Sequence, residues 1–189
     1  MIEKKFLERN SCFTSPTKII PEFIIVHSTG VGYKSKDALF NSWNKPDKLS
    51  VHGMVDNEGA YHTLPLNYLG WHVGKKGNST TVGFEICEPK SIVYLDAAHT
   101  RIDTKRYDPN DTSVYMDFFD RYYNAVSLAE LFCRKLGFSA DRLLSHREAC
   151  KKGIASNHAD VEHWFSLFNV TMDDFRSRVA LGLSQKFIP

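Results

Sequence analysis

The sequence contains few cysteines and no closely spaced pair of them. Its four cysteines, Cys12, Cys87, Cys133 and Cys150, are scattered over 189 residues without a Cys-x-x-Cys motif. Small secreted domains that rely on disulfides carry cysteine more densely, and zinc-ribbon or redox sites need short-spaced pairs. We therefore expect these thiols to be mostly reduced and buried, which favours synthesis in the cytosol.

Long apolar runs are also lacking. The longest early run, Phe23–Val26, is far shorter than the roughly 20 residues needed to span a bilayer. Residues 1–9 mix charges where a secretory signal would carry an apolar run of about 7–15 residues. The sequence predicts a soluble protein that is made in the cytoplasm without a signal peptide and does not insert into membranes.

The charge shows no excess of one sign. The formal net charge is +2, and the lysines and arginines are scattered. This pattern gives no electrostatic footprint for nucleic acid, so we expect no nucleic-acid partner. Any polymer that the protein binds is expected to be recognised by shape and hydrogen bonds. A chain of this size buries roughly 70% of its unfolded surface and needs no disulfide to hold a core.

Hydrophobic patterns along the first half predict a mixed α/β fold. The apolar, β-branched run 23–26 suits a buried strand. Residues 35–43 begin with a serine that can cap a short helix. Segments 51–55 and 60–64 flank the turn sequence 56–59 and predict an antiparallel hairpin.

The second half adds a central strand and two helices. In 81–86, Glu85 alternates with apolar residues, so its side chain should face away from the apolar side of a strand. Residues 88–112 carry turn formers and predict a long loop. Helical spacing over 114–136 predicts the main core helix, which Gly137 should end.

The C-terminal segment predicts a last helix and the end of the domain. Residues 171–174 resemble a capping box, and the helix that follows should end at Gly182. We expect one domain over residues 1–182. Residues 183–189 would form a tail or the start of a linker to a further domain.

Four side chains suit a hydrolytic zinc centre. Catalytic zinc is usually held by three nitrogen, oxygen or sulfur ligands, while a separate carboxylate handles the protons of a water molecule. His27 and His146 each follow a short apolar run, and Asp160 lies in a polar segment with small residues that allow it to bend back. Glu85 lies on the predicted central strand, where a buried carboxylate is costly unless it is paired or used.

Each of these residues also has a plainer interpretation. A single histidine after a strand is more often hydrogen bonded and half buried than bound to a metal. Glu85 could lie on an exposed face of an open sheet, and Asp160 in a solvated polar loop. A structural zinc site with His146 and Cys150 would lack a second short-spaced pair of ligands.

A glycosidase is a different enzyme class that the same carboxylate allows. It would need a second carboxylate about 5–10 Å from Glu85, and it would leave the histidines without a role. The partners that can be proposed are Asp56, Glu88 and Asp96.

Short motifs between about Ile24 and Trp164 resemble a known family. They are His27-Ser28-Thr29, Ser50-Val51-His52, Trp71-His72-Val73-Gly74, Gly83-Phe84-Glu85 and Ser145-His146. Together they resemble the zinc-dependent N-acetylmuramoyl-L-alanine amidases of the type-2 amidase superfamily, which includes phage endolysins, bacterial autolysins and peptidoglycan recognition proteins. The resemblance implies a central mixed β-sheet flanked by helices, a zinc (Zn2+) cofactor and bacterial peptidoglycan as the substrate.

The resemblance also implies roles for individual residues. His27, His146 and Asp160 would be the metal ligands, with Glu85 as the catalytic base. His158, a basic residue two positions before the third ligand, would stabilise the oxyanion.

The same resemblance implies roles for two further residues, and the sequence departs from the family pattern at three points. Trp71 and His72 would line the substrate groove. Val51 stands where some members carry a tyrosine, so Glu85 would act alone. Val161 replaces the proline that usually follows the third ligand, and the preceding loop is longer than usual. Its residues 153–160 look like those of a phage or prophage endolysin subgroup.

The implied function is hydrolysis of the amide bond between N-acetylmuramic acid and L-alanine, and the protein would act on the cell wall after release. The tail could then lead to a wall-binding domain. The alternative is a peptidoglycan-binding module of the same fold without catalysis. Such modules typically lose a zinc ligand, whereas all the ligand candidates are present here.

Overall fold

A six-stranded mixed sheet forms the centre of the fold in the computed structural model, which describes residues 1–30 and 35–185 apart from the side chains of Lys75 and Lys76. The strand order is β1-β4-β3-β5-β2-β6. Among the described strands, β3 and β4 pair antiparallel and the other neighbours pair parallel. The strands are β1 (Ile2–Lys4), β2 (Phe23–Ser28), β3 (Gly53–Asp56), β4 (Gly59–His62), β5 (Thr81–Ile86) and β6 (Leu143–Ser145).

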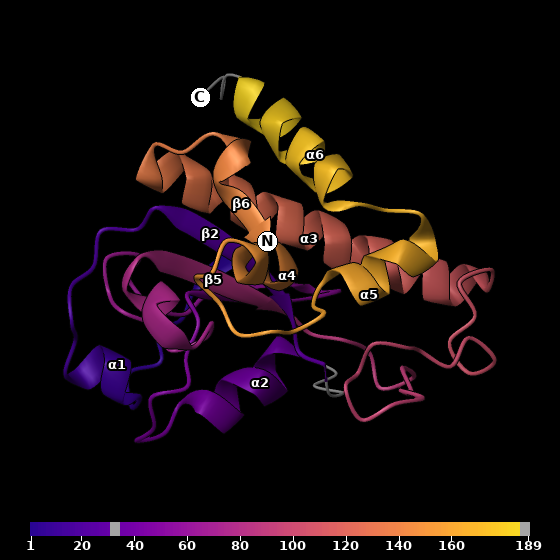
Figure 1. Cartoon of the computed structure of the whole chain (residues 1–189), viewed down its shortest axis with the longest axis horizontal. Coiled ribbons are helices and arrows are strands. Elements are labelled where there is room, and N and C mark those ends of the chain that lie inside the picture. Colours follow the sequence, from indigo (N-terminus) through magenta and orange to yellow (C-terminus); the bar gives the residue numbers. More distant parts are fainter. Residues whose placement is uncertain (31–34, 186–189) are drawn as a thin grey trace.

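Helices cover both faces of this sheet. Figure 1 shows α3 running behind the sheet with α6 packed next to α3, and α2 on the other side of the sheet. The α-helices are α1 (Ser11–Thr14), α2 (Lys36–Trp43), α3 (Thr112–Leu136), α4 (His146–Lys151), α5 (Glu162–Phe165) and α6 (Met172–Ser184). Short 3-10 helices span Lys75–Ser79, Ala140–Arg142 and Ser166–Phe168. None of the helices in the described ranges combines the length and apolarity needed to cross a bilayer.

The two faces of the sheet differ in character because side chains alternate along each strand. On one face, apolar residues of β2 and β5 form the largest core cluster with α3 and α6. On the other face, a smaller cluster joins α2 to β3 and β4. His27 and Glu85 are register partners of β2 and β5 and belong to this second face. The alternation thus places two polar side chains next to each other, away from the main core.

Most of the expected elements are confirmed. Ser35 caps α2 by accepting a hydrogen bond from the backbone of Ala38 (3.2 Å). Gly137 ends α3 in the left-handed conformation, with φ of 69°, which glycine adopts without steric cost. The long loop before α3 contains no strand or helix from residue 88 to residue 111, although Tyr94 and Ile102 form an isolated bridge. All four cysteines are free, and Cys150 alone among them is not fully buried.

The expectation that Gly182 ends the last helix is wrong. The predicted capping box at Thr171 and Asp174 does begin α6, but the helix continues to Ser184. Gly182 faces α3, where an added Cβ would lie 1.9 Å from Oε1 of Glu130, the end of a flexible side chain that can move aside. Glycine inside a helix costs only about 1 kcal/mol relative to alanine, so the packing of α6 against α3 carries the helix past this residue. Of the expected tail, residues 186–189 lie outside the described residues.

Candidate metal centre

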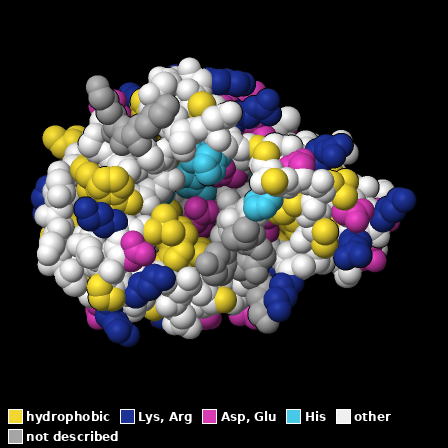
Figure 2. All heavy atoms as spheres, turned by 60° about the horizontal axis from the view of Figure 1, so that its bottom comes forward, with side chains coloured by type: hydrophobic (Ala, Val, Ile, Leu, Met, Phe, Trp, Pro, Cys, Tyr) yellow, Lys and Arg dark blue, Asp and Glu magenta, His cyan; other side chains and the backbone are white. Residues whose placement is uncertain are grey.

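A pocket of about 520 Å³ opens beside the ends of β2 and β5. Figure 2 shows histidine side chains gathered in a hollow near the middle of this face, with acidic side chains beside them. His27, Glu85, His146, His158 and Asp160 all line the pocket. The fold thus brings together residues that are up to 133 positions apart in the sequence.

Three of these residues form a compact group, here called the ligand cluster: His27, His146 and Asp160. Nδ1 of His27 lies 2.9 Å from Oδ2 of Asp160 and 3.1 Å from Nδ1 of His146, which is 3.5 Å from the same carboxylate oxygen. Four-coordinate zinc with bonds of about 2.0–2.2 Å needs ligand atoms about 3.3 Å apart. The cluster therefore fits a zinc ion, and two imidazoles with one carboxylate are donors that zinc prefers.

Strand pairing explains why the two histidines meet. Val26 and Ser145 are register partners of the parallel strands β2 and β6, so the residues that follow them lie side by side. His146 is the first residue of α4, and a capping box between Ser145 and Glu148 fixes this turn. Asp160 comes from the segment that leads into α5.

Burial and hydrogen bonds act on the charge states of His27 and Asp160. It lowers the pKa of His27, which keeps the ring neutral and able to bind a metal. For Asp160, burial acts to raise the pKa, but hydrogen bonds with His146 and His27 outweigh it and hold the pKa well below its usual range. The cluster thus offers an ionised carboxylate beside a neutral imidazole.

Glu85 lies next to the ligand cluster with unused hydrogen-bonding capacity. Its Oε2 atom is buried and has no hydrogen-bond partner among the described residues. Burial, and then the negative charges of Asp160 and Glu88, raise the pKa of Glu85 well above its ordinary value. A carboxylate of this kind can accept and return a proton near neutral pH.

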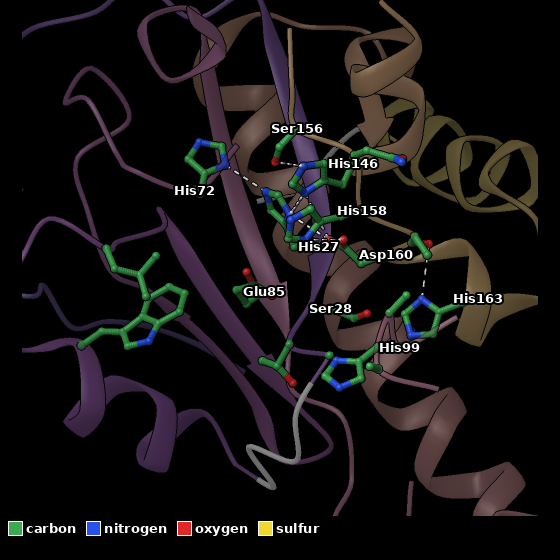
Figure 3. A pocket seen from close by; sticks show the side chains of 18 residues that line it. His27, Ser28, His72, Glu85, His99, His146, Ser156, His158, Asp160 and His163 are labelled. Carbon is green, nitrogen blue, oxygen red and sulfur yellow. Dashed lines mark hydrogen bonds and ion pairs between the residues drawn. The ribbon is translucent and has the colours of Figure 1, made fainter. Parts of the chain in front are cut away.

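His158 lies over the ligand cluster. Its ring is stacked on that of His146, with centroids 4.7 Å apart and planes within 7°. Its Nδ1 atom is 3.9 Å from Oδ1 of Asp160, and its side chain is 62% exposed. In Figure 3, His158 lies beside His146 at the pocket, where it can reach a bound molecule.

His72 and Trp71 have different positions. His72 lines the pocket and contacts a ligand candidate directly, since its Nδ1 atom is 2.9 Å from Nε2 of His27. Burial lowers the pKa of His72 well below its ordinary value, so the ring is neutral. Trp71 is 43% exposed and is not among the described residues that line the pocket. It lies beside Leu49, which does line the pocket.

A second group of polar side chains, which the sequence did not indicate, lies at the edge of the pocket. This Glu88 cluster consists of Glu88, Tyr94 and His163. The Tyr94 hydroxyl donates a hydrogen bond to Oε2 of Glu88, and Nε2 of His163 lies 3.3 Å from Oε1 of Glu88 and 2.8 Å from the Tyr94 oxygen. The three residues come from the long loop and from α5, and no spacing in the sequence connects them.

The alternative sites are not favoured by this geometry. Glu85 and Asp160 are the acidic residues among the described lining of the pocket, whereas Asp56 is buried in an ion pair with Lys36 at 3.0 Å. In the described part of the chain, the group whose donors approach as metal ligands do is the ligand cluster, and it does not include Cys150.

Comparison with solved structures identifies the fold. The chain superimposes on the Staphylococcus aureus hydrolase AmiA, solved with its ligand, with a TM-score of 0.70, 19% identity, and coverage of 97% of this chain and 83% of AmiA. The catalytic domain of XlyA matches with a TM-score of 0.62 and 22% identity, over 95% of this chain and 99% of that domain.

Sequence comparison finds related proteins in Bacillus subtilis strain 168. N-acetylmuramoyl-L-alanine amidase CwlH is 32% identical over 94 residues, which are 46% of this chain and 38% of CwlH. N-acetylmuramoyl-L-alanine amidase XlyA is 39% identical over 74 residues, which are 36% of this chain and 25% of XlyA. The chain thus covers well under half the length of these relatives. The family model described as N-acetylmuramoyl-L-alanine amidase matches residues 16–162, and the chain belongs to that family.

Proposed function

We propose that this chain hydrolyses the amide bond between N-acetylmuramic acid and L-alanine in bacterial peptidoglycan, with Zn2+ held by His27, His146 and Asp160. The observation that carries the proposal is the meeting of three metal-binding donors with the unpartnered carboxylate of Glu85 in one pocket. Family membership and the names of the relatives supply the bond that is cut. A zinc ion in this position would lower the pKa of a water molecule and polarise the substrate carbonyl.

Glu85 acts as the general base and then as the general acid. Its raised pKa lets the carboxylate take a proton from the attacking water and hold it. The same proton then passes to the nitrogen of L-alanine as the amide bond breaks. One carboxylate can perform both transfers because it faces the pocket from the strand next to His27.

His158 stabilises the negative charge that develops on the carbonyl oxygen. Its exposed ring can donate a hydrogen bond into the pocket while the stacking on His146 fixes its plane. Trp71, exposed beside Leu49, offers an aromatic surface for the glycan or the stem peptide at the rim of the pocket.

The proposed catalytic unit spans residues 1–182, and residues after it would lead to a tail or to a linker for a wall-binding domain. The protein would act on the cell wall after release from the cytoplasm, as endolysins and autolysins do. A binding module without catalysis would not need the base, and the presence of Glu85 beside three intact ligand candidates argues for the enzyme.

Digestion of purified cell wall tests this function. We expect new N-terminal alanine to appear without new reducing ends, because the amide is cut and the glycan is not. Glu85→Gln protein serves as the control, since it should bind wall without releasing alanine. New reducing ends would identify a glycosidase, and wall binding with no product from the wild type would identify a binding module.

A further inference from the structure

The ring of His72 is held on all sides, which distinguishes it from an ordinary lining residue. Nδ1 faces Nε2 of His27 at 2.9 Å, and Nε2 lies 3.4 Å from Oγ1 of Thr81. The backbone amides of His72 and Val73 both donate to Oδ1 of Asn78 at 3.0 Å. Both ring nitrogens therefore have protein partners, whereas a residue that binds substrate would keep one of them free.

The absence of a side chain at position 83 makes room for this ring. A Cβ added to Gly83 would lie 2.6 Å from Nδ1 of His72, which is closer than non-bonded atoms approach. Gly83 is in the middle of β5, where glycine weakens a strand unless something packs closely against it. The ring of His72 is the close neighbour at this position.

The hydrogen atoms in this chain of contacts can be assigned one by one. The hydroxyl of Thr81 donates to the carbonyl of Gly77 at 2.8 Å, so towards His72 the oxygen can only accept. The neutral ring of His72 must therefore carry its proton on Nε2, which leaves a lone pair on Nδ1. That lone pair accepts the Nε2 proton of His27. With its proton on Nε2, His27 has a lone pair on Nδ1 that can bind a metal, whereas in the other tautomer Nδ1 carries the proton and donates it to Asp160.

We propose that His72 is a positioning residue that fixes His27 in the tautomer able to bind zinc through Nδ1, and that Thr81 fixes the tautomer of His72. Figure 3 shows the contact from His72 to His27 on the side of the ring opposite the ligand cluster. Histidine ligands of metals commonly donate their second ring proton to a fixed acceptor, which orients the ring and strengthens binding. In this chain the acceptor is another histidine.

Val73, the residue after His72, helps to orient the second histidine ligand, His146, through Ser156. Nε2 of His146 contacts Oγ of Ser156 at 3.2 Å, and that hydroxyl donates to the carbonyl of Val73 at 3.3 Å. The segment that contains His72 and Val73 thus supports both histidines of the ligand cluster from behind.

This inference rests on the proposed zinc site, and zinc affinity tests it without an activity assay. His72→Phe keeps the ring shape and removes the acceptor, and His72→Asn returns an acceptor oxygen near the position of Nδ1. We expect His72→Phe to weaken zinc binding about 10- to 100-fold in competition with a chelator. His72→Asn should recover part of the loss. Thr81→Val should weaken binding by a smaller factor, and Thr80→Val, the same change one residue earlier, should bind like the wild type.

Nitrogen NMR of the zinc-loaded wild type provides a readout that does not depend on the variants. We expect the His27 ring to carry its proton on Nε2 and the His72 ring to do the same. Circular dichroism checks that each variant is folded. If His72→Phe does not fold, the zinc affinity of Thr81→Val and the tautomers of His27 and His72 measured by NMR test the inference instead.

The outcomes separate this inference from the proposed function. Wild-type affinity in His72→Phe, an equal loss in His72→Asn, or a His27 proton on Nδ1 would overturn the inference while the zinc site stands. A wild type that binds no zinc would overturn both.

Discussion

Two groups of histidine and acidic side chains lie at the same pocket. In one group the ring nitrogens are available to a cation, and in the other they donate hydrogen bonds. In the ligand cluster, one ring nitrogen each of His27 and His146 and one oxygen of Asp160 lie within 3.5 Å of one another, so a bound cation would receive their lone pairs. In the Glu88 cluster, the Tyr94 hydroxyl and the His163 ring both donate to the carboxylate.

The state of the histidine makes the difference. Both ring nitrogens of His163 have acceptors, because Nδ1 also faces the carbonyl of Ala159 at 3.3 Å. Burial acts to lower the pKa of His163, but the hydrogen bond and the charge of Glu88 outweigh it and raise the pKa. A ring that donates from both nitrogens has no lone pair left for a metal. The same residue types therefore give a site that requires a cation in one place and a closed ion pair in the other.

The largest expected effect comes from removing the metal. Treatment with a chelator should abolish wall lysis, because the ion supplies the nucleophile, and about one zinc per chain should restore it. Lysis is followed as loss of turbidity of purified walls. Full activity of metal-free protein would remove the ligand cluster from the mechanism.

The next largest effect is expected from Glu85→Gln. This change keeps the size of the side chain and removes the base, so turnover should fall on the order of a hundredfold to ten-thousandfold. Zinc content and fold should stay as in the wild type. Near-normal turnover would assign the proton transfers to another group.

His158→Ala should have a smaller effect on the rate. Loss of one oxyanion donor typically costs about 100- to 1000-fold in turnover, and zinc should remain bound because His158 lies outside the ligand cluster. Release of alanine and zinc content are measured on the same sample. Loss of zinc in this variant would mean that His158 is itself a ligand.

The smallest effect on chemistry is expected from His163→Ala, which should keep zinc and lysis. It should instead cost about 1–3 kcal/mol of unfolding free energy, since the buried carboxylate of Glu88 and the half-buried hydroxyl of Tyr94 lose a partner. Denaturant unfolding with circular dichroism measures this loss. If lysis falls and stability does not, the Glu88 cluster belongs to the active site.

The stability that His163 supplies should also depend on pH. Because its pKa is raised in the folded protein, the contribution is complete below the unfolded value of about 6.5 and is lost as the pH rises through the folded value. The difference in unfolding free energy between wild type and His163→Ala should therefore shrink above neutral pH. A difference that grows with pH would contradict the assignment.

Much of the ligand cluster could be predicted because local sequence patterns indicate where its residues lie in the fold. His27 and His146 follow short apolar runs, and alternation alone placed Glu85 on the face opposite the main core. Asp160 depended more on the family resemblance, since a polar loop has no periodicity to follow.

The remaining contacts depend on packing that the sequence does not display. Glu88 and Tyr94 meet His163 only through the folded loop, 69 residues along the chain in the case of Tyr94. The contact of His72 with His27 likewise crosses 45 residues.

Short elements were missed for a related reason. Strand β1 has three residues, two of them charged, and is recognisable only through its pairing with β4. Helix α4 carried a signal, since Ser145 and Glu148 have capping-box spacing, but a six-residue helix shows little periodicity.

The comparison between the two clusters is tested most directly by zinc stoichiometry in Asp160→Ala and His163→Ala, measured beside the wild type by atomic emission after dialysis. We predict about one zinc per chain in the wild type and in His163→Ala, and a large loss in Asp160→Ala, because two histidines do not hold the ion comparably. Zinc retained by Asp160→Ala and lost from His163→Ala would show that the metal belongs to the other cluster.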